Sequence, residues 1–276
     1  MTSNATLHRP PRHPWLILGC LVASQVAVAA LWWQWGWRWG LPAMIATHLA
    51  VVACTLYPRA TLLCPALARL PVAGRRVWLT IDDGPSDDTL PLLDLLDRHG
   101  ARATFFVVGA RARARPELVR EIVRRGHGLG NHSDGHRDRI FWMLGPWRMA
   151  REIGECQRTL QDITGAAPRW FRSVVGMTNP FVALPLHRLG LTRVAWSARG
   201  FDGVDCEPAQ VLDRITGDIA PGAIVLLHEG AKHGHNVAIA AALLQWMVAH
   251  GWQSVLPEQL EAERLGAVSG RMVQEG

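Results

Sequence analysis

The sequence predicts an α/β protein with a parallel sheet, doubly wound or closed as a barrel, preceded by a pair of transmembrane helices. Three observations support this class. The most apolar stretches lie before residue 58. Beyond residue 76, short β-type runs alternate with helical patterns about seven times, as in parallel sheets. Charged side chains follow several of these runs, where such folds place their sites.

The composition narrows the possible functions. The chain has 276 residues, is 49% hydrophobic and carries a net charge of +6. This length suits one catalytic domain plus an appendage. The charge could attract nucleic acid, but Lys232 is the only lysine, and we attribute the excess to an arginine bias. No zinc finger, RNA-binding aromatic signature or basic helix is present, so we expect no nucleic-acid partner.

Two apolar runs open the chain. Residues 15–33 are long enough to cross a bilayer, and residues 40–57 form a second candidate that contains Pro42 and His48. Tryptophans cluster between the runs, and tryptophan favours the headgroup level of a membrane. We therefore predict a transmembrane hairpin over 14–57. A cleaved signal peptide is the alternative, but the first run continues past its candidate cleavage site.

Arginines indicate how the hairpin is oriented. Only Arg38 lies at its tip, whereas six flank its two ends: Arg9, Arg12, Arg59, Arg69, Arg75 and Arg76. The positive-inside rule then places both ends in the cytoplasm of a bacterium, with two spans in the inner membrane. Insertion of only one span would move the catalytic domain to the other side. The predicted units are a tail (1–13), the hairpin (14–57), a linker (58–75), a catalytic domain (76–262) and a second tail (263–276).

The catalytic domain divides into strands and helices by its apolar spacing and its Gly and Pro residues. Leucines at helical spacing precede Gly100, and another helical pattern begins at Pro116 and ends before Gly126. Strands are expected over 76–81, 103–109, 127–133, 169–173, 192–197, 223–229 and 252–256. Helices are expected over 89–100, 116–125, 147–165, 180–189, 208–219 and 236–250.

Chemically reactive side chains come just after the strand-like runs: Asp82, Asp83, His132, Arg172, Asp202 and His228. His132 and His136 stand four residues apart, so one helical turn or a tight loop can point both at one ion. With Asp83 they supply two imidazoles and one carboxylate, a set that leaves positions open on a catalytic metal. Zinc suits these ligands best, and cobalt or nickel would bind the same set.

Five segments resemble the motifs of one family. They are TIDDGP (80–85), HSDGH (132–136), WFRSVVG (170–176), WSARGFDG (196–203) and IVLLHEG (224–230). Over roughly residues 76–260 the sequence resembles the polysaccharide deacetylases, which are the NodB-type enzymes of carbohydrate esterase family 4. The hydrophobic hairpin lies outside this resemblance.

The resemblance implies a distorted (β/α) barrel that removes an acyl group from an N-acylated sugar with a divalent metal. Asp83, His132 and His136 would be the metal ligands. Asp82 would be the general base, held by Arg172, and His228 the general acid. This division agrees with the chemistry, because amide hydrolysis needs both a bound metal and a free base, and two adjacent carboxylates can share those tasks.

Two motifs depart from the family pattern. The third has Ser173, Val174 and Val175 where Pro and an aromatic residue normally follow the arginine. The fourth has Arg199 where an Asp normally adjusts the histidine that acts as general acid, and Asp202 is the expected substitute for that Asp. The sugar groove is therefore expected to be unusual.

The predicted substrate is an N-acyl amino sugar in a membrane-associated saccharide or glycolipid, and the acyl group that we expect is acetyl. One alternative is a deformylase or deacylase of a lipid-phosphate-linked sugar. Another is a catalytically weak, membrane-anchored carbohydrate-binding protein. Residues 137–147, directly after the second histidine, mix arginines with aromatic residues. They predict either a buried loop or an apolar lip beside the metal.

Overall fold

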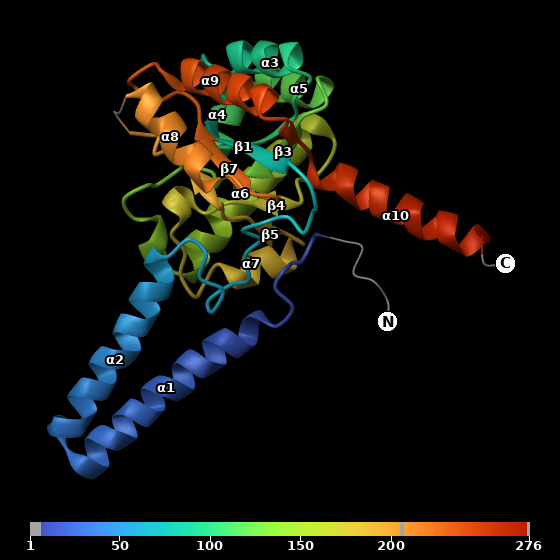
Figure 1. Ribbon diagram of the computed structural model, residues 1–276. Coiled ribbons are helices and arrows are strands. Elements are labelled where there is room, and N and C mark those ends of the chain that lie inside the picture. Colours follow the sequence, from blue (N-terminus) through green and yellow to red (C-terminus); the bar gives the residue numbers. More distant parts are fainter. Residues whose placement is uncertain (1–6, 205–206, 275–276) are drawn as a thin grey trace.

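The computed structural model describes residues 7–204 and 207–274, with side chains described as far as Gly266. The ends of both predicted tails and one of the cysteines, Cys206, lie outside these residues. An α/β domain carries a projecting pair of long helices (Figure 1). The described part therefore has the two units that the sequence predicts.

The domain is built on an eight-stranded sheet with the order β5-β4-β3-β2-β1-β7-β6, and β8 pairs with the start of β1. All pairings between these strands are parallel, and none within the described residues joins β5 to β6. The sheet is thus an open, distorted parallel barrel, and the predicted fold class is confirmed. The strands are β1 (Arg76–Gly84), β2 (Ala103–Val107), β3 (Gly128–Asn131), β4 (Trp170–Phe171), β5 (Thr192–Arg193), β6 (Ala198–Arg199), β7 (Ile224–His228) and β8 (Gln253–Ser254).

Helices connect the strands and cover the sheet. Alternate residues of β1 pack against leucines of α3 and α9 in one buried cluster. Proline occupies the first turn of α5, α6 and α8, where its missing N–H costs no hydrogen bond. The helices are α3 (Thr89–Arg98), α4 (Gly109–Ala114), α5 (Pro116–Arg124), α6 (Pro146–Thr164), α7 (Ala183–Arg188), α8 (Pro208–Asp218), α9 (Asn236–Ala249) and α10 (Pro257–Gln274).

Three features differ from the elements expected. The short helix α4 was not predicted, because six residues show too little periodicity. The expected strand 192–197 forms a strand only over its first two residues, as β5, because Val194 bridges to Leu67 in the linker, and the next strand, β6, begins after it at Ala198. The helix α10 continues across the expected boundary at residue 262.

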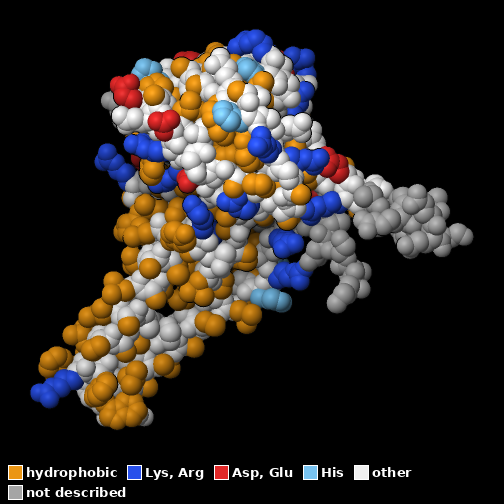
Figure 2. Space-filling view, in the orientation of Figure 1, with side chains coloured by type: hydrophobic (Ala, Val, Ile, Leu, Met, Phe, Trp, Pro, Cys, Tyr) orange, Lys and Arg blue, Asp and Glu red, His pale blue; other side chains and the backbone are white. Residues whose placement is uncertain are grey.

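The projecting helices are α1 (Pro14–Trp35) and α2 (Trp37–Leu56), which turn at Gly36 and pack against each other. Hydrophobic side chains cover their outer surface (Figure 2). Both are long and apolar enough to cross a membrane. At 1.5 Å per residue α1 is about 33 Å long, which matches the ~30 Å hydrocarbon core of a bilayer. Exposed tryptophans cluster at the turn: Trp32, Trp33, Trp35, Trp37 and Trp39.

The linker after α2 is fastened to the domain by Arg193 at the end of β5. This side chain is buried, and its guanidinium donates to the backbone carbonyls of Pro58, Ala60, Cys64 and Pro65. The N–H of Thr178 also donates to the last turn of α2 at Thr55, at 3.2 Å. These bonds fix the base of the hairpin beside the carboxyl ends of the strands.

Candidate active site

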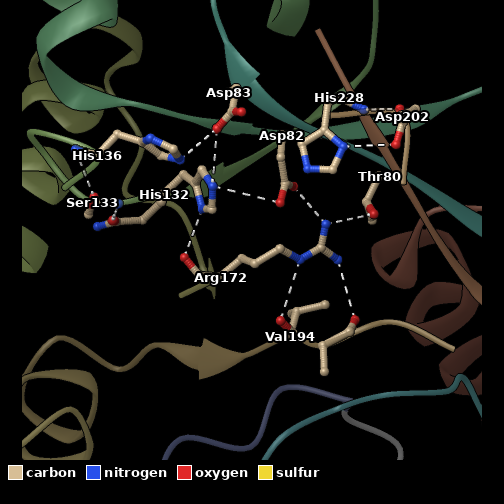
Figure 3. A network of polar contacts seen from close by, with 12 residues as sticks. Thr80, Asp82, Asp83, His132, Ser133, His136, Arg172, Val194, Asp202 and His228 are labelled. Atoms are coloured by element: carbon tan, nitrogen blue, oxygen red, sulfur yellow. Dashed lines mark hydrogen bonds and ion pairs between the residues drawn. The ribbon is translucent and has the colours of Figure 1, made fainter. Parts of the chain in front are cut away.

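Asp82 and Asp83 both reach one cavity because β1 contains a bulge. Consecutive side chains of a regular strand point to opposite faces. Here Asp82 pairs with Phe106 and Gly84 with Val107, which leaves Asp83 as the extra residue. Its φ of 72° lies in the left-handed region, where a non-glycine residue is uncommon. The bulge turns the Asp83 carboxylate beside the histidines, close to Asp82 (Figure 3).

The two histidines lie in a tight loop after β3, not on a helix. His136 has a φ of 43°, and its N–H donates to Ser133 Oγ at 3.2 Å. His132 Nδ1 donates to the carbonyl of Arg172 at 2.9 Å, so the lone pair of Nε2 is free to bind a metal. Nε2 of His132 and of His136 lie 3.4 and 2.8 Å from the same atom, Asp83 Oδ1.

This group fits a divalent cation. One ligand atom from each of Asp83, His132 and His136 lies within 4.8 Å of the others. Asp83 Oδ1 is buried and accepts no hydrogen bond from the described residues. Burial alone would raise the pKa of Asp83, but the two histidines beside it hold this pKa well below its ordinary value. An ionised carboxylate with two imidazoles is a donor set typical of zinc and similar metals.

Asp82 is held by a buried arginine from the end of β4. Arg172 Nη1 donates to Asp82 Oδ1 at 2.7 Å and to Thr80 Oγ1 at 2.8 Å. Its other nitrogens donate to the carbonyls of Val194 and Ala195. A buried charge is tolerated when it is paired and hydrogen-bonded in this way. One oxygen of Asp82 is thereby fixed, and Oδ2 faces His132 Nε2 at 3.7 Å.

His228, at the end of β7, is paired with Asp202. Its Nδ1 donates to Asp202 Oδ1 at 2.9 Å, and its backbone N–H donates to Oδ2 at 2.6 Å. Burial would lower the pKa of His228, but the charge of Asp202, its hydrogen bond and the nearby acids raise this pKa to about 9. His233 and Asn236 in turn donate to the carbonyl of Asp202. The contact with Asp202 therefore favours the protonated form of His228.

One cavity of about 370 Å³ joins these groups. Asp82, Asp83, His132, His136 and His228 line it, whereas Arg172 and Asp202 lie behind its wall, so the structure assembles every predicted site residue. The residues of the altered motifs, Val175 and Arg199, also line it. Of five non-glycine residues with positive φ among those described, four line this cavity: Asp83, His136, Val175 and Phe201. Such strain concentrates at functional sites.

The segment 137–147 does not form an apolar lip at this cavity. Phe141 and Leu144 are buried in a cluster with residues of β4 and α7. Met143 and Trp147 are exposed but lie outside the cavity wall, to which only Asp138 contributes. The buried-loop interpretation describes this segment better.

Sequence reasoning missed several supporting residues. Among them, Thr80 binds Arg172, Asn236 binds the carbonyl of Asp202, and Arg111 donates to the carbonyl of Asp83. Thr80 could have been found, since it lies two residues before Asp82 and therefore on the same face of β1. The other two come from helices remote in sequence and carried no signal.

Comparisons with known proteins agree with this geometry. The polysaccharide deacetylase pattern matches residues 69–194, which include Asp82, Asp83, both histidines and Arg172. A chitooligosaccharide deacetylase of Sinorhizobium fredii is 35% identical over 160 residues, covering 56% of this chain and 72% of the relative. A peptidoglycan-N-acetylglucosamine deacetylase of Listeria monocytogenes is 30% identical over 227 residues, and the match spans 81% of this chain but 47% of that protein.

Solved structures of carbohydrate esterases also resemble this chain in fold. A family 4 carbohydrate esterase from Streptomyces lividans, in complex with acetate, has a TM-score of 0.61 at 30% identity over 68% of this chain and 96% of the other. The fold and the site thus define a hydrolase with a distorted parallel barrel that acts on carbon–nitrogen bonds other than peptide bonds. More specifically, the chain belongs to the polysaccharide deacetylase family, of the NodB type.

Proposed function

We propose that this chain is a metal-dependent hydrolase that removes an N-acyl group, in the first instance acetyl, from an amino sugar in a membrane-associated saccharide or glycolipid. The observation that carries the proposal is the single cavity shared by the ligand group, Asp82 and His228. The names of the relatives, which act on chitooligosaccharide and peptidoglycan N-acetylglucosamine, support an N-acetylated sugar.

Asp83, His132 and His136 would hold the ion, zinc in the first instance, with cobalt or nickel as alternatives. When bound, such an ion supplies a Lewis acid that polarises the amide carbonyl and lowers the pKa of water. Asp82 accepts the proton of the attacking water, and Arg172 keeps this carboxylate oriented. His228 Nε2 donates a proton to the departing amine, since Asp202 occupies Nδ1. The products are the free amino sugar and a carboxylate.

The pH profile should report the pairing of His228 with Asp202. A general acid must be protonated, so activity falls as pH rises through the pKa of His228. This pKa is about 9 without metal and lower once a cation binds nearby. The Asp202→Asn variant loses the negative charge that raises the pKa of His228. We therefore expect the alkaline limb of the kcat/KM profile to move down by about one to three pH units. An unchanged limb would remove His228 from the acid role.

Acyl release tests the whole proposal. Metal-loaded full-length enzyme is incubated with soluble and lipid-linked N-acetyl and N-formyl sugars, and acetate and formate are measured. We expect acetate, with the lipid-linked sugars preferred. Dominant formate would favour a deformylase. No release across the panel, from folded and metal-loaded protein, would favour a carbohydrate-binding role.

We also propose that the α1–α2 hairpin crosses the inner membrane twice, with the catalytic domain in the cytoplasm. The length and apolar surface of both helices support insertion. Arginines at both hairpin ends, and only Arg38 near the turn, support the orientation. Basic side chains also lie on the domain around the base of the helices (Figure 2).

Cysteine labelling in intact cells would test this orientation. A membrane-impermeant maleimide should label a Gln34→Cys variant at the turn in cells with a permeabilised outer membrane. A Glu263→Cys variant, in α10 directly after the catalytic domain, should react only after the inner membrane is opened. The reverse pattern would place the domain outside the cytoplasm and favour a cell-wall substrate.

A further inference from the structure

A second hollow lies beside the catalytic cavity, on the side of the linker that follows α2. Its volume is about 460 Å³, and it shares Trp196, Arg199 and Phe201 with the catalytic cavity. A substrate that occupies both hollows would place one group at the reacting centre and another beside these three residues.

This second hollow is lined by three arginines from separate parts of the chain. Arg59 belongs to the linker, Arg199 to β6 and Arg214 to α8. The guanidinium of Arg199 lies 3.8 Å from the ring centre of Phe201, and that of Arg214 lies 5.8 Å from it. Phe201 itself has a φ of 68°. The aromatic ring thus stacks with the guanidinium of Arg199 and leaves its N–H edge available, as in many phosphate sites.

These arginines lack anionic partners among the described residues. Neither Arg59 nor Arg199 forms a hydrogen bond or ion pair there, and Arg214 donates only to the Gly200 carbonyl and Gln210 Oε1. Burial and the charge of Arg59 lower the pKa of Arg199, which is consistent with two neighbouring cations. Asp213 and Asp218 also line the hollow, but neither is within ion-pair distance of these guanidinium groups.

The position of Arg59 connects the hollow to the membrane. Arg59 follows the last residue of α2, Leu56, by three residues. Pro58 packs against the cavity wall, since a Cβ on Gly176 would lie 2.8 Å from Pro58 and 2.3 Å from Trp196. With α2 across the bilayer, Arg59 lies at the level of the lipid headgroups.

We propose that Arg59, Arg199 and Arg214 form a binding site for a phosphate ester, so that the substrate is an N-acyl sugar carried on a phosphate or pyrophosphate. The assignment rests on the proposed hydrolase function and specifies its substrate class. Guanidinium groups bind phosphate through paired, charge-assisted hydrogen bonds, and a neutral oligosaccharide offers them no such partner. A lipid-linked sugar phosphate and a soluble one share this chemistry.

Substrate preference in metal-loaded full-length enzyme tests the site. The substrates are a prenyl-phosphate-linked N-acetyl sugar in vesicles, N-acetylglucosamine 1-phosphate and a neutral N-acetyl oligosaccharide. We expect the first two to be preferred over the third, and Arg59→Ala to reduce this preference in kcat/KM about tenfold or more, mainly through KM. The exposed Arg120 of α5 provides the matched control, and Arg120→Ala should leave the preference unchanged.

The outcomes separate this proposal from the proposed function. Loss of preference with both phosphate substrates identifies phosphate as the recognised group. Loss with the prenyl-linked substrate alone indicates that the recognised phosphate belongs to a lipid in the bilayer. Release that is equally efficient from the neutral sugar, or Arg59→Ala acting equally on all three, would overturn the phosphate site and leave the hydrolase intact. Titration of pyrophosphate into the Asp82→Asn variant, with and without Arg199→Ala, measures phosphate binding without turnover. We expect weaker binding with Arg199→Ala, and equal affinity in the two proteins would refute the phosphate site.

Discussion

Acyl release should fall by about 10²- to 10⁴-fold when Asp82 is replaced by Asn, which is the range for loss of a general base. Asn keeps the size of the side chain and can still accept the hydrogen bond of Arg172, but it cannot take a proton from water. Metal content should remain at the wild-type level, because Asp82 lies beside the ligand group without belonging to it. The measurement is acetate release, with metal analysis of the same samples.

The matched control is Thr80→Val. Thr80 contacts the same Arg172 nitrogen and is buried, but it carries no titratable group. Its loss should reduce the rate far less than loss of the Asp82 carboxylate. If Asp82→Asn retained near-wild-type release with its metal bound, the base would have to be another group, and our assignment would be wrong.

Replacing a metal ligand should have an equally large effect with a different signature. In Asp83→Ala or His136→Ala the three-ligand group is broken, and both metal content and activity should fall. A catalytic metal contributes several kcal/mol to the transition state, so the rate loss should be about 10³-fold or more. The measurements are elemental analysis of the purified protein and acetate release.

Chelation provides the corresponding test on the wild-type protein. A chelator should abolish activity, and added zinc, cobalt or nickel should restore it in wild type but not in His136→Ala. The exposed His250, at the end of α9, supplies a histidine control outside the site. Full activity in the metal-free enzyme would contradict the proposed role of Asp83, His132 and His136.

Much of the site was accessible from the sequence, because its residues follow strands that all end at the same edge of the sheet. Asp82, Asp83, His132 and His228 each come after an apolar run, and parallel pairing brings those ends together. The resemblance to the polysaccharide deacetylase motifs then supplied roles. The two N-terminal apolar runs could also be recognised from the sequence, since hydropathy depends on composition and length alone.

Other features depend on contacts between distant residues. The bulge that turns Asp83 into the cavity is a difference in register between β1 and β2, which no periodicity in β1 reveals. Asp202 was only a candidate partner until the fold brought it to His228. The anchoring of the linker by Arg193 links positions more than 120 residues apart, and this contact places Arg59 beside the active site.

The sequence by itself determined the alternation of strands and helices, the apolar hairpin and the identity of the chemical groups at the strand ends, because each is a local pattern. Only the tertiary structure decided which of these groups share a cavity, how both carboxylates of the Asp82–Asp83 pair face it, and where the base of the hairpin lies relative to it. The physical reason is that strand register and buried polar pairing are satisfied between segments far apart in the chain.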